Sequence, residues 1–377
     1  MGAPYTWRQG RYSLDMSLSA AYTEPISRRT GRGRGYSDLH SDRKRRHLEI
    51  CLTEDVQSRL STGLERYGLV PQALPEMALA EVDLHTVFLG HTLGAPVLIS
   101  AMTGGAARAY AINRRLAAAA QRYGLAMGVG SQRVGIEDPA EMESFSVRDV
   151  APDILLLANL GAVQLNHGYG VRQCLAAVES IGANALVLHL NPLQEAVQPG
   201  GDTDYRDLSA KIAALCRELP YPVIAKEVGW GLSREAALRL RDAGVAALDV
   251  AGAGGTSWSR VERYRAATPA AARVAAAFDD WGLPTVDTLA QVRAACPDLP
   301  IIASGGLTDG VEVAKCLALG ASLGGMARPL LRPAVDSLEA AVEALGVVVD
   351  QLRIAMFGAG ACTVADLTPD RLFLRSR

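Results

Sequence analysis

The chain has 377 residues, 49% of them hydrophobic, and a formal net charge of −2 at pH 7. This length suits one large domain or two smaller ones, and the near-neutral charge gives no reason to expect nucleic acid as a partner. The six cysteines are scattered singly, which argues against a zinc ribbon or a redox dithiol. Because we find neither a long apolar run nor a signal-peptide core, we expect a cytoplasmic protein without membrane contact.

Two segments precede the first strong strand pattern. Residues 1–41 are basic and rich in glycine, serine and tyrosine, without apolar periodicity, so we predict a disordered extension. An arm that contacts RNA is the alternative. Residues 42–95 are predicted to form a substrate clamp and to cap the fold. Their run Arg-Lys-Arg-Arg-His at 43–47 is either the solvated face of a helix or a clamp for an anion such as a diphosphate.

From residue 96 to about residue 360, apolar runs alternate with helical patterns. Eight of these runs are predicted strands: 96–101, 125–129, 153–158, 185–189, 222–226, 247–251, 300–303 and 322–326. Each is followed by a helix pattern, which is the repeat of an α/β fold, the (β/α)8 TIM barrel. A doubly wound open sheet is the alternative, although it does not need an eighth unit. We predict that the barrel spans residues 96–360 and that its last element is one long amphipathic helix at about 333–357. Residues 361–377 would form a C-terminal tail.

The stretch from His189 to Asp204 is the first candidate for an active site. It follows a buried strand and supplies an imidazole, two amides and a carboxylate within seven residues. These groups belong to His189, Asn191, Gln194 and Glu195. Polar side chains at the carboxyl end of a barrel strand are typical of catalytic sites. A polar loop with a capping role is the alternative, and we expect no helix before about Tyr205.

Glycine-rich turns follow the last two predicted strands. The seventh ends in Ser304-Gly305-Gly306-Leu307, and the eighth contains Gly324-Gly325-Met326-Ala327-Arg328. Barrels bind phosphate at this place through backbone N–H groups and a helix N-terminus. Tight turns alone would require some of these glycines, but two neighbouring clusters favour a phosphate site. The sequence Gly254-Gly255-Thr256 after the sixth strand would add further donors.

Three charged residues allow more than one interpretation. Lys226 ends a buried strand, where it would pair with Glu227, form a Schiff base or donate a hydrogen bond to a flavin. Glu195 would ligate Mg²⁺, which commonly binds one carboxylate together with substrate phosphate oxygens. Glu262 is either a surface charge on a helix or a second acid/base group, and on the residues alone we interpret it as a surface charge.

Several of these motifs occur together and in order. The most specific are His-x-Asn-x-x-Gln-Glu at 189–195 and Gly-Gly-Thr-Ser-Trp at 254–258. The others are Arg43-Lys44-Arg-Arg-His47, Ala101-Met102-Thr103-Gly104-Gly105, Gly130-Ser131-Gln132-Arg133, Ala158-Asn159-Leu-Gly161, Lys226-Glu-Val-Gly229 and Ser304-Gly305-Gly306. Over about residues 42–360 the chain thereby resembles the FMN-dependent, type 2 isopentenyl-diphosphate isomerases.

This family interconverts isopentenyl and dimethylallyl diphosphate with reduced FMN and Mg²⁺, and NADPH or NADH keeps the flavin reduced. The resemblance also implies a homotetramer or homo-octamer. It implies that FMN is held by Ala101, Met102, Thr103, Ser131, Asn159, Lys226, Thr256, Gly305, Gly306, Leu307, Ala327 and Arg328. It implies that the substrate is held by Arg43, Lys44, His47, Arg133, His189, Asn191 and Gln194, with Glu195 as the Mg²⁺ ligand.

Moving a double bond requires one proton to be delivered and another removed, away from water. An amide such as Gln194 is a poor acid, so the reduced flavin is the expected proton carrier. Gln194 and Glu262 would relay or position protons, His189 would assist at the substrate, and Trp258 would wall the pocket.

Two other functions compete with this one. An FMN-dependent 2-hydroxy-acid oxidase or dehydrogenase would share the barrel and the phosphate site. Those families resemble one another in a His-Gly-Gly-Arg-type base motif late in the barrel, whereas the single His-Gly pair here, His167-Gly168, follows the third predicted strand. A flavin- or phosphate-binding barrel without catalysis is the other competitor.

Overall fold

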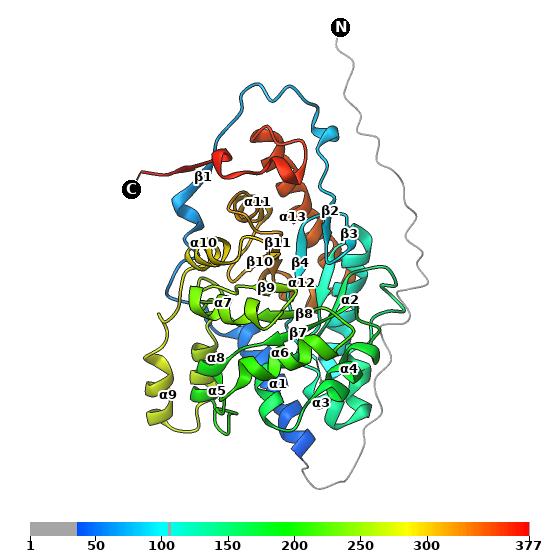
Figure 1. The fold of residues 1–377 in the computed structure, drawn as a ribbon, viewed down its shortest axis with the longest axis vertical. Helices are drawn as coiled ribbons and strands as arrows, with labels where there is room; N and C mark the ends of the chain where they lie inside the picture. Colours follow the sequence, from blue (N-terminus) through cyan, green and yellow to red (C-terminus); the bar gives the residue numbers. More distant parts are fainter. Residues whose placement is uncertain (1–35, 105–106, 377) are drawn as a thin grey trace. The chain divides into compact units, whose positions relative to one another are not determined.

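Eight parallel strands form a closed barrel in the part of the chain that the computed structural model describes, residues 36–104 and 107–376 (Figure 1). The strands are β4 (Val97–Ile99), β5 (Ala126–Gly128), β6 (Leu156–Gly161), β7 (Ala185–His189), β8 (Val223–Lys226), β9 (Ala247–Asp249), β10 (Ile301–Ser304) and β11 (Leu323–Met326). They pair in chain order, and β11 closes the ring on β4. Nearly every strand residue is buried, as expected of parallel strands covered by helices. The predicted (β/α)8 barrel is confirmed. Residues 1–35 of the predicted extension lie outside the described residues, and residues 36–41, predicted to be disordered with them, belong to a helix instead.

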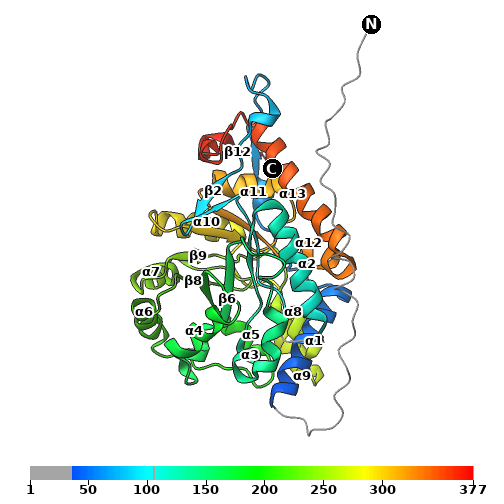
Figure 2. The same cartoon turned by 90° about the vertical axis from the view of Figure 1, so that its right-hand side faces the viewer.

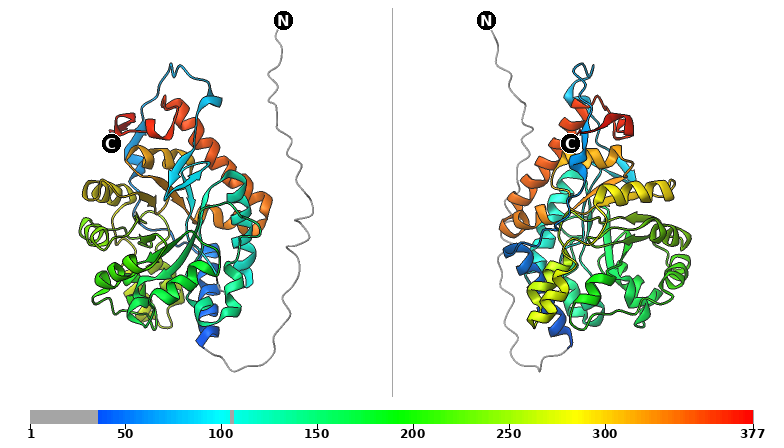
Figure 3. Two further views of the ribbon diagram at one scale, coloured as in Figure 1. Left: turned by 45° about the vertical axis from the view of Figure 1, so that its right-hand side comes forward. Right: turned by 90° about the vertical axis from the view of Figure 1, so that its left-hand side faces the viewer.

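Helices surround the barrel (Figure 3). Those that lie between successive strands are α2 (Ala107–Tyr123), α3 (Arg133–Glu137), α4 (Val171–Glu179), α5 (Pro192–Val197), α6 (Leu208–Glu218), α7 (Arg234–Asp242), α8 (Trp258–Arg265), α9 (Pro269–Ala276), α10 (Thr285–Ala295) and α11 (Gly310–Ala318). Ser233, the predicted cap of α7, accepts a hydrogen bond from the Ala236 backbone N–H at 3.1 Å. Helix α1 (Tyr36–Thr53) precedes the barrel and contacts α3, α8 and α12 (Figure 2).

A hairpin closes the end of the barrel where the strands begin. Strands β2 (Thr86–Phe88) and β3 (His91–Leu93) are joined by Leu89 and Gly90, which have φ values of 48° and 79°. Positive φ at both central residues is the mark of a type I′ turn. Phe88 and Leu93 are buried in one cluster with the inward-facing apolar residues at the start of the barrel strands. The hairpin thus fills the end of the barrel where the strands begin with apolar side chains.

The end of the chain differs from the prediction of one long helix at 333–357. Two helices occupy this region, α12 (Arg328–Asp336) and α13 (Leu338–Gly358). Ser337 adopts an extended conformation between them, and its hydroxyl accepts a hydrogen bond from the Ala340 backbone N–H at 3.0 Å. The Ser337 cap thus starts a new helix, although the apolar pattern of the sequence continues through it. After α13, β12 (Leu372–Leu374) pairs with β1 (Tyr67–Leu69).

Among the described residues, no helix is both long enough and apolar enough to span a membrane.

Candidate active site

A cavity of about 630 Å³ opens where the barrel strands end. This volume lies within the usual range of cofactor and ligand sites. With one exception, every predicted site residue lines it, and the exception is Glu262. The lining includes Arg43, Lys44, His47, Ala101, Met102, Thr103, Ser131, Arg133, Asn159, His189, Asn191, Gln194, Glu195, Lys226, Thr256, Trp258, Gly305, Gly306, Leu307, Ala327 and Arg328. Arg43 and Arg328, which are 285 positions apart in the chain, therefore meet at one site.

Helix α1 forms one wall of the cavity. Its basic run divides by helical spacing: Arg43, Lys44 and His47 face the cavity, whereas Arg45 and Arg46 are exposed. Lys44 Nζ donates a hydrogen bond to the backbone oxygen of Ser131 at 2.6 Å and lies 5.1 Å from the centre of the Phe145 ring. Burial, and then the positive charge of Arg43, lower the pKa of Lys44 to about 7. The run thus has one exposed face, as a solvated helix face would, and its other face lines the cavity, where the anion clamp stays a prediction.

Glu262 on α8 is buried, with only 1% of its surface exposed, so its assignment as a surface charge was wrong. Its Oε1 lies 2.8 Å from His47 Nε2, and Arg265 pairs with its other oxygen. Gln194 also forms a hydrogen bond with this carboxylate. Burial raises the pKa of Glu262, but the hydrogen bond and charge of His47 and the charge of Arg265 outweigh that effect and lower the pKa. Glu262 is therefore an ionised carboxylate directly behind the cavity wall.

His189 ends β7 at the floor of the site. Its Nδ1 lies 2.8 Å from the Asn159 side-chain oxygen, which fixes the ring and favours the proton on Nδ1. Burial first, and then the nearby charges of Lys226, Lys44 and Arg43, lower the pKa of His189 to about 3. The imidazole thus stays neutral near pH 7 and serves as a hydrogen-bonding group rather than as a cation.

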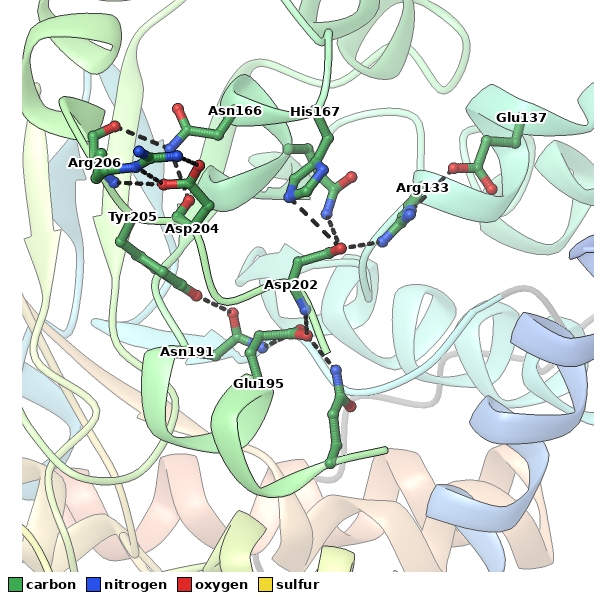
Figure 4. Close-up of polar contacts among 12 residues, drawn as sticks. Arg133, Glu137, Asn166, His167, Asn191, Glu195, Asp202, Asp204, Tyr205 and Arg206 are labelled. Carbon is green, nitrogen blue, oxygen red and sulfur yellow. Dashed lines mark hydrogen bonds and ion pairs between the residues drawn. The ribbon is translucent and has the colours of Figure 1, made fainter. Parts of the chain in front are cut away.

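The loop after β7 contains a helix that the sequence did not lead us to expect. Helix α5 begins at Pro192, a residue favoured in a first helical turn, and turns Gln194 and Glu195 toward the cavity. Asn191 Nδ2 donates to Gln194 Oε1 at 3.1 Å and to Glu195 Oε1 at 2.9 Å. The hydroxyl of Tyr205 donates to the Asn191 oxygen at 3.2 Å (Figure 4). These contacts hold the two amides and the carboxylate in a fixed arrangement.

Arg133, at the start of α3, lies between two carboxylates. Its Nε is 2.9 Å from Glu137 Oε1, and its Nη1 is 2.6 Å from Asp202 Oδ2 (Figure 4). Asp202 belongs to the predicted active-site stretch, but we assigned it no role. Its partner lies 69 residues earlier in the chain, and no spacing rule links the two positions.

Lys226 at the end of β8 does not form the ion pair with Glu227, which was one of its three interpretations. Its Nζ donates to the Glu227 backbone oxygen at 2.7 Å and lies 3.9 Å from the carboxylate of Asp249. The Glu227 side chain instead accepts the backbone N–H groups of Gly229, Trp230 and Gly231. Asp249, which also accepts a hydrogen bond from Ser304 at 2.5 Å, was missed, although a carboxylate at the end of an apolar strand is a signal.

Glycines shape the far side of the cavity. A Cβ on Gly255 would lie 2.6 Å from the backbone nitrogen of Gly306, so only glycine leaves that N–H group accessible. Helix α12 begins beside it, and its N-cap, Ala327, offers no side-chain acceptor to the first N–H groups. Open N–H groups at a helix start attract an anion. This geometry suits a phosphate at the ends of β10 and β11.

Comparison with known proteins fits this geometry. A model of the FMN-dependent dehydrogenases matches residues 203–374. The chain is 51% identical over 326 residues to the isopentenyl-diphosphate delta-isomerase of a Nostoc species, covering 86% of this chain and 93% of that one. It is 55% identical over 316 residues to the protein of that name from a Synechococcus species, covering 84% and 91%. The chain belongs to the isopentenyl-diphosphate delta-isomerase family.

Solved structures with the same fold are more distant. A flavocytochrome b2 mutant superimposes with a TM-score of 0.65 at 16% identity, covering 87% of this chain and 83% of that one. A mandelate oxidase mutant with an FMN adduct superimposes with a TM-score of 0.59 at 19% identity, covering 89% and 100%. At such identities these structures support the barrel alone. The curated relatives therefore confirm the predicted family, the isopentenyl-diphosphate delta-isomerases, and the predicted enzyme class, an isomerase.

Proposed function

We propose that the protein interconverts isopentenyl diphosphate and dimethylallyl diphosphate, with reduced FMN and Mg²⁺, and with NADPH as the reductant that keeps the flavin reduced. The observation that carries the proposal is the composition of the cavity at the strand ends. Arg43, Lys44 and Arg133 line it, as do the glycines of the candidate phosphate site, and His47 in its wall pairs with Glu262, which Gln194 also contacts. Membership of the isomerase family supports the same reaction.

The residues of the cavity fit FMN. Gly255, Gly306 and the start of α12 form the anion site that a flavin phosphate requires. Ser100 has a buried hydroxyl without a partner among the described residues, and it lines the same cavity. Lys226 reaches the floor from β8 and would donate to the flavin ring, since its contact with Asp249 is long at 3.9 Å. Reduced FMN would supply acid–base chemistry next to the double bond.

The protein's own groups would manage the protons around the substrate. Glu262 is ionised and hydrogen-bonded to His47 and Gln194, so it can accept a proton while it orients both neighbours. The Gln194 side chain is hydrogen-bonded to both Glu262 and Asn191, so it can orient a proton path without itself being an acid. Trp258 lies edge-on to His47, with ring centres 5.3 Å apart, and shields this pair. Exclusion of water there would protect the developing positive charge on the prenyl carbon.

The diphosphate would bind between α1 and α3. Arg43, Lys44 and Arg133 are the cations that line this part of the cavity, and two guanidinium groups can each engage two phosphate oxygens. Glu195 would hold Mg²⁺ beside them. Mg²⁺ commonly binds through one or two protein carboxylates and completes its ligand set with substrate phosphate oxygens and water.

The test is an anaerobic assay with FMN, Mg²⁺ and NADPH, started in turn from each of the two diphosphates. We expect both reactions to reach the same product ratio, because an isomerase catalyses both directions. A protein that binds FMN but forms no allylic product, and that instead oxidises 2-hydroxy acids, would refute the proposal in favour of a hydroxy-acid oxidase.

A further inference from the structure

Asp202 links two groups of the site without lining the cavity itself. It lies in the loop between α5 and α6, and Figure 4 shows it between Arg133 and Glu195. Its Oδ2 is 2.6 Å from Arg133 Nη1 and accepts a hydrogen bond from Gln164 Nε2 at 3.0 Å. Its Oδ1 faces His167 Nε2 at 3.6 Å. At the same time its backbone N–H donates to Glu195 Oε2 at 2.8 Å.

The loop is shaped to bring this backbone N–H to Glu195. A Cβ on Gly201 would lie 1.9 Å from the backbone oxygen of Glu195, so the loop can pass this close to α5 only with glycine there. Gln198 donates a hydrogen bond to the same Glu195 oxygen. Glu195 Oε2 therefore accepts from two donors of this loop, and its direction depends on where the loop lies.

Arg133 is oriented by the same residue. A guanidinium is planar, so contacts of Nε with Glu137 and of Nη1 with Asp202 fix the plane as well as the position of the group. An arginine side chain has many rotamers, and ordering it before a ligand arrives removes part of the entropy cost of binding. A carboxylate that is only 20% exposed is well placed to do this.

We propose that Asp202 is a positioning residue that aligns Arg133 and Glu195 as one unit for a magnesium diphosphate. The inference rests on the proposed function, because it assumes that Arg133 meets the diphosphate and that Glu195 meets Mg²⁺. The Asp202 side chain anchors the loop to Arg133, and its backbone anchors the loop to Glu195. Loss of the side chain would thus loosen both groups.

Removing the negative charge of Asp202 would also affect diphosphate binding, in the direction opposite to the loss of alignment, and the two effects can be told apart by their sign. Removing a carboxylate near Arg133 would strengthen the long-range attraction for a diphosphate, and that effect would tighten binding. Loss of alignment would weaken binding instead. Outer partners of metal and anion ligands typically contribute 10- to 100-fold. Alignment therefore predicts a net loss of binding, and the charge effect alone predicts a gain.

The experiment measures binding of inorganic pyrophosphate to FMN-loaded protein by calorimetry, with and without Mg²⁺. For Asp202→Ala we expect binding to weaken about tenfold or more and half-saturation by Mg²⁺ to need a higher concentration. Asp204→Ala is the matched control, because this carboxylate in the same loop faces outward and pairs with Arg206 at 2.6 Å. FMN content and melting temperature should be the same in both variants.

Without Mg²⁺, the effect of Asp202→Ala should disappear in an Arg133→Ala background, because the side chain acts through Arg133. Gly201→Ala is the second variant. It should raise the Mg²⁺ requirement by displacing the loop from Glu195, even if Asp202→Ala does not fold. Tighter pyrophosphate binding, equality with the Asp204 control or additivity with Arg133→Ala would each overturn the proposal. If the wild type isomerises normally in such a case, this inference fails alone; a wild type that does not isomerise refutes the proposed function instead.

Discussion

Glu262 shows how a single residue can join parts of the site that are distant in the chain. His47 lies 215 residues before it, and Gln194 comes from another helix. From the sequence alone, its carboxylate between Arg260 and Arg263 resembles an ordinary exposed helix charge. Its burial depends on α1 packing across α8, and no local pattern records that contact. Residues at strand ends, such as His189 and Lys226, could be predicted because barrel topology brings all strand ends together.

Glu262→Gln should lower kcat by about 100-fold or more, because an amide cannot take up the proton that an ionised carboxylate accepts. FMN content should not change, since Glu262 lies behind the cavity wall. Glu235→Gln on the surface of α7 is the control. Steady-state rates and flavin absorbance of both variants give the answer, and unchanged turnover in Glu262→Gln would remove this residue from the proton path.

Lys44 should give the enzyme an alkaline limit. Its pKa of about 7 means that the ammonium is charged below this pH and loses its proton above it. The attraction for the diphosphate then weakens, so kcat/KM should fall as pH rises above about 7. In Lys44→Arg the side chain keeps its charge, and the decline should move beyond pH 9. Identical pH profiles for the wild type and Lys44→Arg would contradict this assignment.

At the scale of elements, the glycine turns after β9 and β10 and the start of α12 after β11 all line the cavity, where they would form a single anion site. Their positions could be predicted because glycine clusters at strand ends are visible in the sequence. The short helix α5 could not, because six residues are too few to show helical periodicity. The break between α12 and α13 was missed for a different reason, since the apolar pattern continues through Ser337 and only the cap marks the new start.

Gly255→Ala should weaken FMN binding by about tenfold or more. The added methyl group would lie over the Gly306 N–H and deprive the flavin phosphate of a donor. Gly170→Ala is the matched control, because a Cβ there meets no atom within 4 Å. Titration of the apoproteins with FMN, followed by flavin fluorescence, compares the two. Equal affinities would place the phosphate elsewhere in the cavity.

At the scale of the whole molecule, the apolar β2–β3 hairpin and the candidate active site lie at opposite ends of the barrel. The β2–β3 hairpin fills one end with apolar side chains, and the cavity occupies the other. The order and number of the barrel strands could be predicted from eight apolar runs. The hairpin could not be predicted, because its strands are only three residues long and the side chains that it packs against come from strands throughout the barrel.

Phe88→Ala should destabilise the fold by about 3 to 5 kcal/mol, the usual cost of emptying a buried aromatic site. Phe88 is 2% exposed, whereas its neighbour Val87 is 67% exposed, so Val87→Ala is the matched control and should change stability little. Urea unfolding of both variants measures the difference. Equal urea midpoints for Phe88→Ala and Val87→Ala would show that Phe88 in the hairpin does not stabilise the fold.

The most direct test of the central claim is the number of product molecules formed for each NADPH oxidised, measured anaerobically with isopentenyl diphosphate, FMN and Mg²⁺. An isomerase that uses reduced flavin for acid–base chemistry consumes no net reductant once the flavin is reduced. We therefore predict many molecules of dimethylallyl diphosphate for each NADPH. One NADPH oxidised for every substrate molecule converted would show a reduction instead, and would contradict the account.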